Sequence, residues 1–282
     1  MPIYNGGGMD SPKRSTAALA AMAAQMKRTI VTVCGSAALL VAVSPTAKAD
    51  AFLSLQNGAT LLSCNNSTAA GVAACLASGF TTVLGGNGIA FAGAVGGYSV
   101  FDLSLTSNSP GSPALGFATD TKTAVTNVSG GATALTVLFA VNNFALPAGS
   151  PLTLSASQAA TFVSATAGSS QNFVAWGNAA NTLGAGPGNG VPVATPDCVN
   201  PANAPPVNAC STVGVPVVFN RAGNFALNGR EIINLNQGGT ANFQGSIAVT
   251  PPSVVPEPGS LVLLATGLFG LVGGRRVFRR KA

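Results

Sequence analysis

Residues 134–141 read Ala-Leu-Thr-Val-Leu-Phe-Ala-Val, and this stretch indicates the fold more clearly than any other part of the chain. The large apolar residues Leu135, Val137, Phe139 and Val141 fall on every second position. Successive side chains of a strand point to opposite faces of a sheet, so this period of two predicts a half-buried β-strand.

Similar segments recur along the central part of the chain. Phe101, Leu103 and Leu105 alternate with Val100, Asp102 and Ser104. Clusters of Gly, Pro, Asn and Ser separate further candidate strands at 152–157, 160–165, 172–176, 214–220, 231–235 and 241–249. Short strands at this spacing are typical of a β-sandwich or jelly roll, so we expect a mainly β body.

Two segments of the body do not fit a strand pattern. Residues 68–78 are rich in alanine and predict a short helix despite Gly71. Residues 183–213 contain six prolines and two cysteines, and we expect them to form a long surface loop.

The composition argues against most enzymes and against nucleic-acid binding. The 282 residues include no histidine, which excludes His-based nucleophile pairs, His general bases and His-ligated metals. Only 7% of the residues are charged, which favours an extracytoplasmic protein. Ten of the thirteen Lys and Arg residues lie in 1–49 and 259–282, so the net charge of +6 describes the two ends and not a phosphate-binding surface.

The N-terminal region has the order of a secretory signal peptide. Lys27 and Arg28 precede an apolar stretch at 30–43, and the small residues Ala47 and Ala49 fit the signal peptidase pattern. We therefore expect a signal helix within residues 26–49 and cleavage after Ala49, with an N-terminal membrane anchor as the alternative. Residues 1–25 fit poorly ahead of a signal and are interpreted as a misassigned start.

The C-terminal region, 253–282, has three parts in a fixed order. Pro256, Glu257 and Pro258 form a stiff extended element with one protruding carboxylate. The apolar segment 259–274 predicts a transmembrane helix of only about 24 Å, short for a bilayer core of about 30 Å. The basic tail at 275–282 favours a cytoplasmic end and contains Arg275, Arg276, Arg279, Arg280 and Lys281.

This C-terminal order resembles the PEP-CTERM sorting signal of Gram-negative bacteria. The resemblance implies recognition near Pro256, Glu257 and Pro258 by a membrane-embedded exosortase, transient insertion of 259–274 in the inner membrane, and delivery to the cell surface or extracellular matrix. An ordinary membrane anchor after a proline-rich linker is the alternative. The resemblance covers about the last 30 residues and implies nothing about the activity of the body, 50–252.

The cysteines of the body predict disulfides. Cys34 lies in the signal peptide, so four cysteines remain after its removal. An even number in an exported chain favours disulfides, and the pairing of neighbours, Cys64 with Cys75 and Cys198 with Cys210, closes two short loops. The other two pairings stay open, and a four-thiolate zinc site is the less favoured alternative because no C-x2-C spacing is present.

The remaining chemical signals are weak, and we expect a protein that is not an enzyme and has no cofactor or metal. A carboxylate pair such as Asp102 and Glu231 could serve a hydrolase, but both residues are better interpreted as surface residues. Trp176 with Phe173 could form a sugar-stacking platform, although a lone Trp is more often in a core. We therefore expect a non-catalytic surface or matrix protein of a biofilm or floc. Its expected partners are signal peptidase, exosortase, the inner membrane and extracellular polysaccharide, with no nucleic acid; a glycan-binding, lectin-like module is the alternative.

Overall fold

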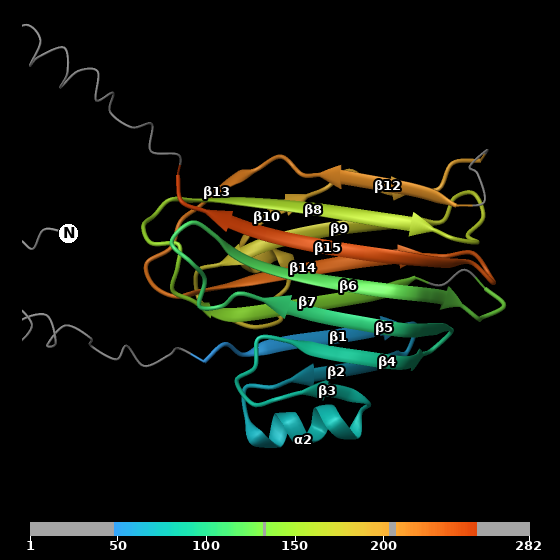
Figure 1. Cartoon of the computed structure of the whole chain (residues 1–282), viewed down its shortest axis with the longest axis horizontal. Helices are drawn as coiled ribbons and strands as arrows, with labels where there is room; N and C mark the ends of the chain where they lie inside the picture. The colour runs from blue at the N-terminus through green and yellow to red at the C-terminus, as the bar shows by residue number, and fades with distance from the viewer. Residues whose placement is uncertain (1–47, 132–133, 203–206, 253–282) are drawn as a thin grey trace, which may run out of the picture. The chain divides into compact units, whose positions relative to one another are not determined.

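The computed structural model describes residues 48–131, 134–202 and 207–252, and within them the chain forms two antiparallel β-sheets around one hydrophobic core (Figure 1). The expectation of a mainly β body is confirmed. The segments that would form the signal helix, the helix at 259–274 and the basic tail lie outside the described residues.

The described elements are fifteen strands, one α-helix and one 3-10 turn. In chain order they are β1 Ala51–Asn57, β2 Thr60–Asn65, α2 Ala69–Ala77, β3 Phe80–Thr82, β4 Ile89–Val95, β5 Tyr98–Ser107, β6 Gly116–Asn127, β7 Leu135–Phe144, β8 Leu152–Phe162, β9 Ser170–Asn178, η1 Pro187–Asn189, β10 Val191–Ala194, β11 Cys198–Val199, β12 Asn208–Val213, β13 Val217–Phe219, β14 Phe225–Asn234 and β15 Thr240–Thr250.

The strand order brings residues far apart in sequence into neighbouring positions. The first sheet has the order β10-β9-β14-β7-β1-β2, with β11 also paired to β9. The second has the order β12-β8-β15-β6-β5-β4-β3, with β13 also paired to β8. The consecutive strands β14 and β15 therefore lie in the interiors of different sheets, and side chains from their inner faces meet between the sheets.

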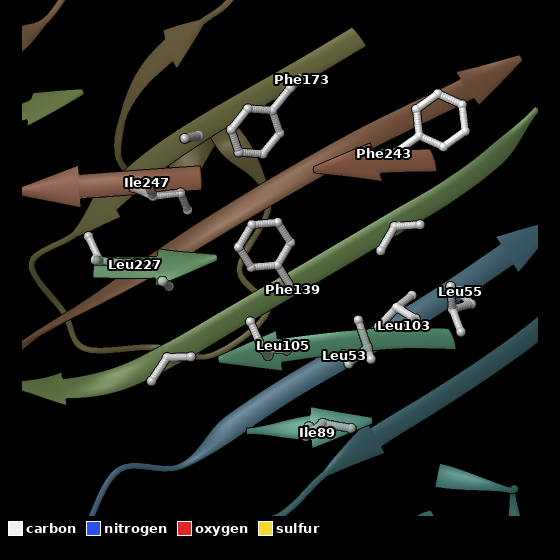
Figure 2. Packing of buried hydrophobic residues seen from close by; sticks show 14 of the residues in the cluster. Leu53, Leu55, Ile89, Leu103, Leu105, Phe139, Phe173, Leu227, Phe243 and Ile247 are labelled. Carbon is white, nitrogen blue, oxygen red and sulfur yellow. The ribbon is translucent and has the colours of Figure 1, made fainter. Parts of the chain in front are cut away.

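The strand containing 135–141 shows how the alternating pattern builds the core. On β7 the side chains of Leu135, Val137, Phe139 and Val141 are buried. Phe139 stacks on Phe173 of β9 with ring centroids 6.0 Å apart, and Figure 2 shows both rings among aliphatic side chains of the core. Burial of apolar surface at about 25 cal/mol per Å² is the main stabilising contribution of such a core.

The face assignment on β5 was correct for Leu103 and Leu105 but wrong for Phe101. On the side that faces β4, Phe91 pairs with Leu103 and Gly93 pairs with Val100, so Phe101 and Asp102 together oppose the single residue Ala92 as a bulge in β5. A bulge adds one residue to a strand and reverses the alternation on one side of it. Val100 is therefore buried while the Phe101 side chain is 73% exposed.

Two further boundaries differ from the sequence prediction. The candidates at 152–157 and 160–165 are one strand, β8, because its alternation continues through Gln158, a buried glutamine. The expected long loop at 183–213 instead contains β10, β11 and β12. Pro192 fits within β10 because this strand is at the end of its sheet, where a missing backbone donor leaves no ladder bond unmade.

The predicted helix is present as α2, and its start has a physical cause. The Thr68 hydroxyl accepts a hydrogen bond from the backbone N–H of Gly71, which is an N-cap arrangement. The Cys75 side chain is buried and forms a disulfide with Cys64 on β2. The helix is thus fixed beside the outermost strand of the first sheet.

Both disulfides have the pairing between sequence neighbours. Cys64 bonds to Cys75 and Cys198 bonds to Cys210. Each disulfide includes a cysteine from a strand at the end of its sheet, β2 in the first sheet and β12 in the second. The cross-links therefore secure strands that have a neighbour on one side only.

Candidate functional site

A cluster of three charged side chains lies between the two sheets. The ammonium group of Lys122 on β6 forms an ion pair with Asp120 on the same strand, and its Nζ lies 2.7 Å from Oε2 of Glu231 on β14. All three side chains are fully buried. Lys122 therefore connects the second sheet to the first through a charge pair.

Strand geometry explains how the three side chains meet. Asp120 and Lys122 are two residues apart on β6, so both point to the same face of the second sheet. Glu231 follows Leu227 and Gly229 at intervals of two on β14, and all three positions are buried. The inner faces of β6 and β14 thus bring the groups together.

A glycine on β15 provides the space for the cluster. The backbone N–H of Gly245 donates a hydrogen bond of 3.1 Å to Oδ1 of Asp120. A Cβ atom at this position would lie 2.8 Å from the same oxygen and would also collide with Oε1 of Glu231. Gly245 is therefore required by the close approach of the two carboxyl groups to the strand backbone.

Burial changes the protonation of the cluster. Loss of hydration raises the pKa of the Glu231 carboxyl to about 8, and the nearby charge of Asp120 adds to this rise against the opposing effect of Lys122. Burial is the largest influence on Lys122 and disfavours its charge, but the attraction of Asp120 and Glu231 outweighs it and raises the pKa of the ammonium group. At neutral pH Glu231 is thus largely the neutral acid, held beside the Lys122 ammonium group.

The structure places the two sequence-predicted carboxylates apart. Asp102 is exposed on β5, as expected, whereas Glu231 is buried between the sheets. The interpretation of Glu231 as a surface residue is wrong, because it lies on the inner face of an interior strand. The partner that sequence reasoning missed is Lys122, and one signal was available: it is the only lysine between residues 50 and 258, and an aspartate precedes it by two positions.

Trp176 and Phe173 do not form a sugar-stacking platform. Both are fully buried, and their separation of three residues places them on opposite faces of β9. Phe173 faces the core, whereas Trp176 is on the other face of the sheet, close to Gly190. A ring covered in this way is not available to an external ligand.

A shallow hollow lies on the outer face of the second sheet. It opens between strands β6, β8 and β15 and has a volume of about 230 Å³. Hydroxyl and amide groups dominate its lining, which includes Thr121, Thr123, Thr161, Asn242 and Gln244.

An exposed aromatic ring accompanies the hollow on the second sheet. Phe101 is the bulged residue of β5 next to Asp102, which pairs with Thr123 of the hollow. Ser104 and Thr121 share a hydrogen bond of 2.8 Å on the same face. This face therefore combines one exposed ring with short hydroxyl and amide side chains.

A second hollow, of about 350 Å³, lies beside Arg221, and the contacts of this arginine with the surrounding loops indicate a structural role for it. The guanidinium group donates hydrogen bonds to several backbone carbonyls and lies 5.0 Å from the centre of the Phe225 ring. The carbonyls that accept these bonds belong to Phe144, Ala145, Pro147, Gly149 and Gly223. With its donors used in this way, Arg221 fixes the surrounding loops.

The described residues bear on metal binding, on membrane-spanning helices and on one residue of the expected signal peptide. Over the described ranges, no group of three or more His, Cys, Asp or Glu side chains is placed to hold a metal ion. No helix within these ranges is long and apolar enough to cross a membrane. Ala49 is buried just before β1, whereas Ala47, the motif at 256–258, the segment 259–274 and the basic tail lie outside the described residues.

Comparison with known proteins bears on the C-terminal region. Residues 254–280 match the family model of the PEP-CTERM protein-sorting motif. No curated protein matches the chain. The match agrees with the resemblance seen at Pro256, Glu257 and Pro258, and this motif implies export and a destination at the cell surface or outside the cell.

Proposed function

Because residues 254–280 match the PEP-CTERM protein-sorting motif, we propose that this chain is an exported, exosortase-processed component of the cell surface or extracellular matrix, without catalytic activity of its own. The single observation that carries the proposal is the sorting motif at 254–280. In this proposal a signal peptide ends at Ala49, the body 50–252 is delivered outside, and the exosortase recognises Pro256, Glu257 and Pro258.

The body supports a role outside the cell. Its two disulfides suit an oxidising compartment, and its charged cluster is closed off from solvent and so from any external substrate. The exposed surface of the second sheet is rich in uncharged hydroxyl and amide groups, which suits contact with hydrated polysaccharide. A biofilm or floc matrix is the setting that we propose.

The sorting proposal is tested by changing the motif in the native bacterium. Replacing Pro256, Glu257 and Pro258 with alanine is expected to leave most of the protein in the membrane fraction, because the exosortase no longer recognises its extended element. The fraction released from the cells is measured by immunoblotting, and intact mass shows whether the tail is retained.

A matched control is available a few residues upstream. Replacing Pro251 and Pro252 with alanine also removes prolines before the apolar segment, but it leaves the Pro-Glu-Pro element intact. This control is expected to be released like the wild type. Equal release of the motif variant and the wild type would contradict the proposal.

A second candidate function is glycan binding at the hollow on the second sheet. The observation that favours it is Phe101, whose side chain is 73% exposed and which precedes Asp102, the β5 partner of Thr123 in the lining of the hollow. Aromatic rings stack on the apolar faces of sugars while hydroxyl and amide groups bind their oxygens. This surface replaces Trp176 as the proposed glycan contact.

The glycan proposal predicts a loss of binding when Phe101 is replaced. The variant Phe101→Ala is expected to bind polysaccharide from the native matrix at least about tenfold more weakly, since about 1.4 kcal/mol of lost stacking produces that change. Binding is measured by calorimetry or co-sedimentation. The variant Leu61→Ala, in which an exposed side chain on β2 of the other sheet is shortened, is the control. Equal binding by all three proteins would contradict this function.

A further inference from the structure

The buried cluster places an amine and two carboxyl groups at contact distance where no external substrate reaches them. Nζ of Lys122 lies 2.7 Å from Oε2 of Glu231, and Asp120 contacts the same nitrogen. The three side chains are fully buried. Two groups held in such an arrangement react as one molecule, with effective concentrations far above those possible in solution.

The two carboxyl groups have different surroundings. Oδ1 of Asp120 accepts a hydrogen bond from the backbone N–H of Gly245, and its Oδ2 contacts the Lys122 nitrogen. Oε1 of Glu231 accepts no hydrogen bond from the described residues, and its burial favours the neutral acid, whose pKa is about 8. The acid of Glu231 is thus suited to be attacked, and the carboxylate of Asp120 is suited to accept a proton.

We propose that Lys122 and Glu231 condense into an amide bond that links the two sheets covalently, with Asp120 as the proton acceptor. The Lys122 ammonium group transfers one proton to Asp120, and the nitrogen lone pair attacks Cδ of Glu231. The bond from Cδ to the hydroxyl oxygen breaks, and this hydroxyl leaves as water with a second proton from the nitrogen. The third proton remains on the amide nitrogen, and Asp120 ends as a neutral acid.

The condensation removes charge from the interior of the protein. Before it, an ammonium ion and a carboxylate are buried together; after it, the amide and the Asp120 acid are both neutral. Buried ions carry a large desolvation cost that pairing offsets only in part, so this change favours the product. The reaction needs no oxidant, nucleotide or other reactant.

The linkage is tested by mass spectrometry of the protein purified from the cells that make it, after peptide mapping has established where the processed chain begins and ends. After reduction of the disulfides, the wild type is expected to lack the mass of one water molecule relative to its sequence. Tandem mass spectrometry of a digest is expected to find the peptide containing Lys122 joined to the peptide containing Glu231. The variant Lys122→Met is expected to have its full mass, and Asp102→Asn, an exposed acid on β5, is expected to retain the loss of water.

Three results would overturn the proposal. The first is a wild-type protein at full mass, and the second is a link from Lys122 to Asp120 instead of Glu231. The third is a titrating Glu231. A carboxyl group with a raised pKa in the folded state contributes stability below its unfolded pKa of about 4.5, and this contribution is lost as pH rises through about 8. An amide does not titrate, so a fall in stability over this range that Glu231→Gln abolishes would show a free acid.

Discussion

Replacing Lys122 with methionine is expected to lower the free energy of unfolding by at least about 3 kcal/mol, because the change leaves two buried carboxyl groups without their cation. Methionine fills a similar space but neither pairs with a carboxylate nor forms an amide. The loss is therefore expected whether the Lys122 nitrogen is an ammonium ion or is bonded to Glu231. Equilibrium unfolding in guanidinium chloride measures it through the shift of the midpoint.

A combined variant separates the charge effect from a packing effect. In Asp120→Asn/Lys122→Met/Glu231→Gln all three titratable groups are removed together, so no unpaired carboxyl group remains. We expect this triple variant to be more stable than Lys122→Met alone by at least about 2 kcal/mol. A single variant that costs less than about 1 kcal/mol, or a triple variant no better than the single one, would show that the cluster is not important for stability.

Replacing Gly245 with alanine is the second change with a large expected effect, a loss of about 3 kcal/mol in the free energy of unfolding. The added methyl group would lie 2.8 Å from Oδ1 of Asp120 and 3.0 Å from Cε2 of Phe173, and it would also collide with the Glu231 carboxyl group. These neighbours are held between interior strands and cannot move away without disturbing the core. Thermal and denaturant unfolding both measure the loss.

The matched control for this change is Gly188→Ala. A Cβ atom at Gly188 would meet nothing within 4 Å, and this glycine does not have a positive φ. Its replacement is expected to change stability by less than about 0.5 kcal/mol. A similar loss in both variants would mean that the contacts of Gly245 are not its cause.

The sequence was sufficient for features that depend on local pattern. Alternation at Leu135, Val137 and Phe139 predicted a strand, and alanine content at 68–78 predicted a helix. The cysteine spacing favoured the pairing between neighbours that the structure contains. Each of these depends on residues close together in the chain.

Features that depend on distant residues were not predicted. The bulge at Phe101 arises from the pairing of β5 with β4, and the burial of Glu231 depends on which strands flank β14. A charged residue normally indicates a surface, and the pattern cannot show that Glu231 contacts Lys122, which is more than 100 residues away in the sequence. Likewise, the sequence favoured burial of Trp176, but it did not indicate that this side chain is covered on the outer face of its sheet.

The position of the two disulfides implies that the end strands β2 and β12 are fixed only after the chain reaches an oxidising compartment. Each bond fixes a strand at the end of a sheet, and neither bond forms readily in a reducing compartment. A chain still in the cytoplasm therefore lacks the cross-links at its sheet margins, which favours a loose, translocatable state. After export, oxidation fixes β2 and β12 in place, so the same two bonds that complete the fold also make these two end strands harder to detach and pair with another copy.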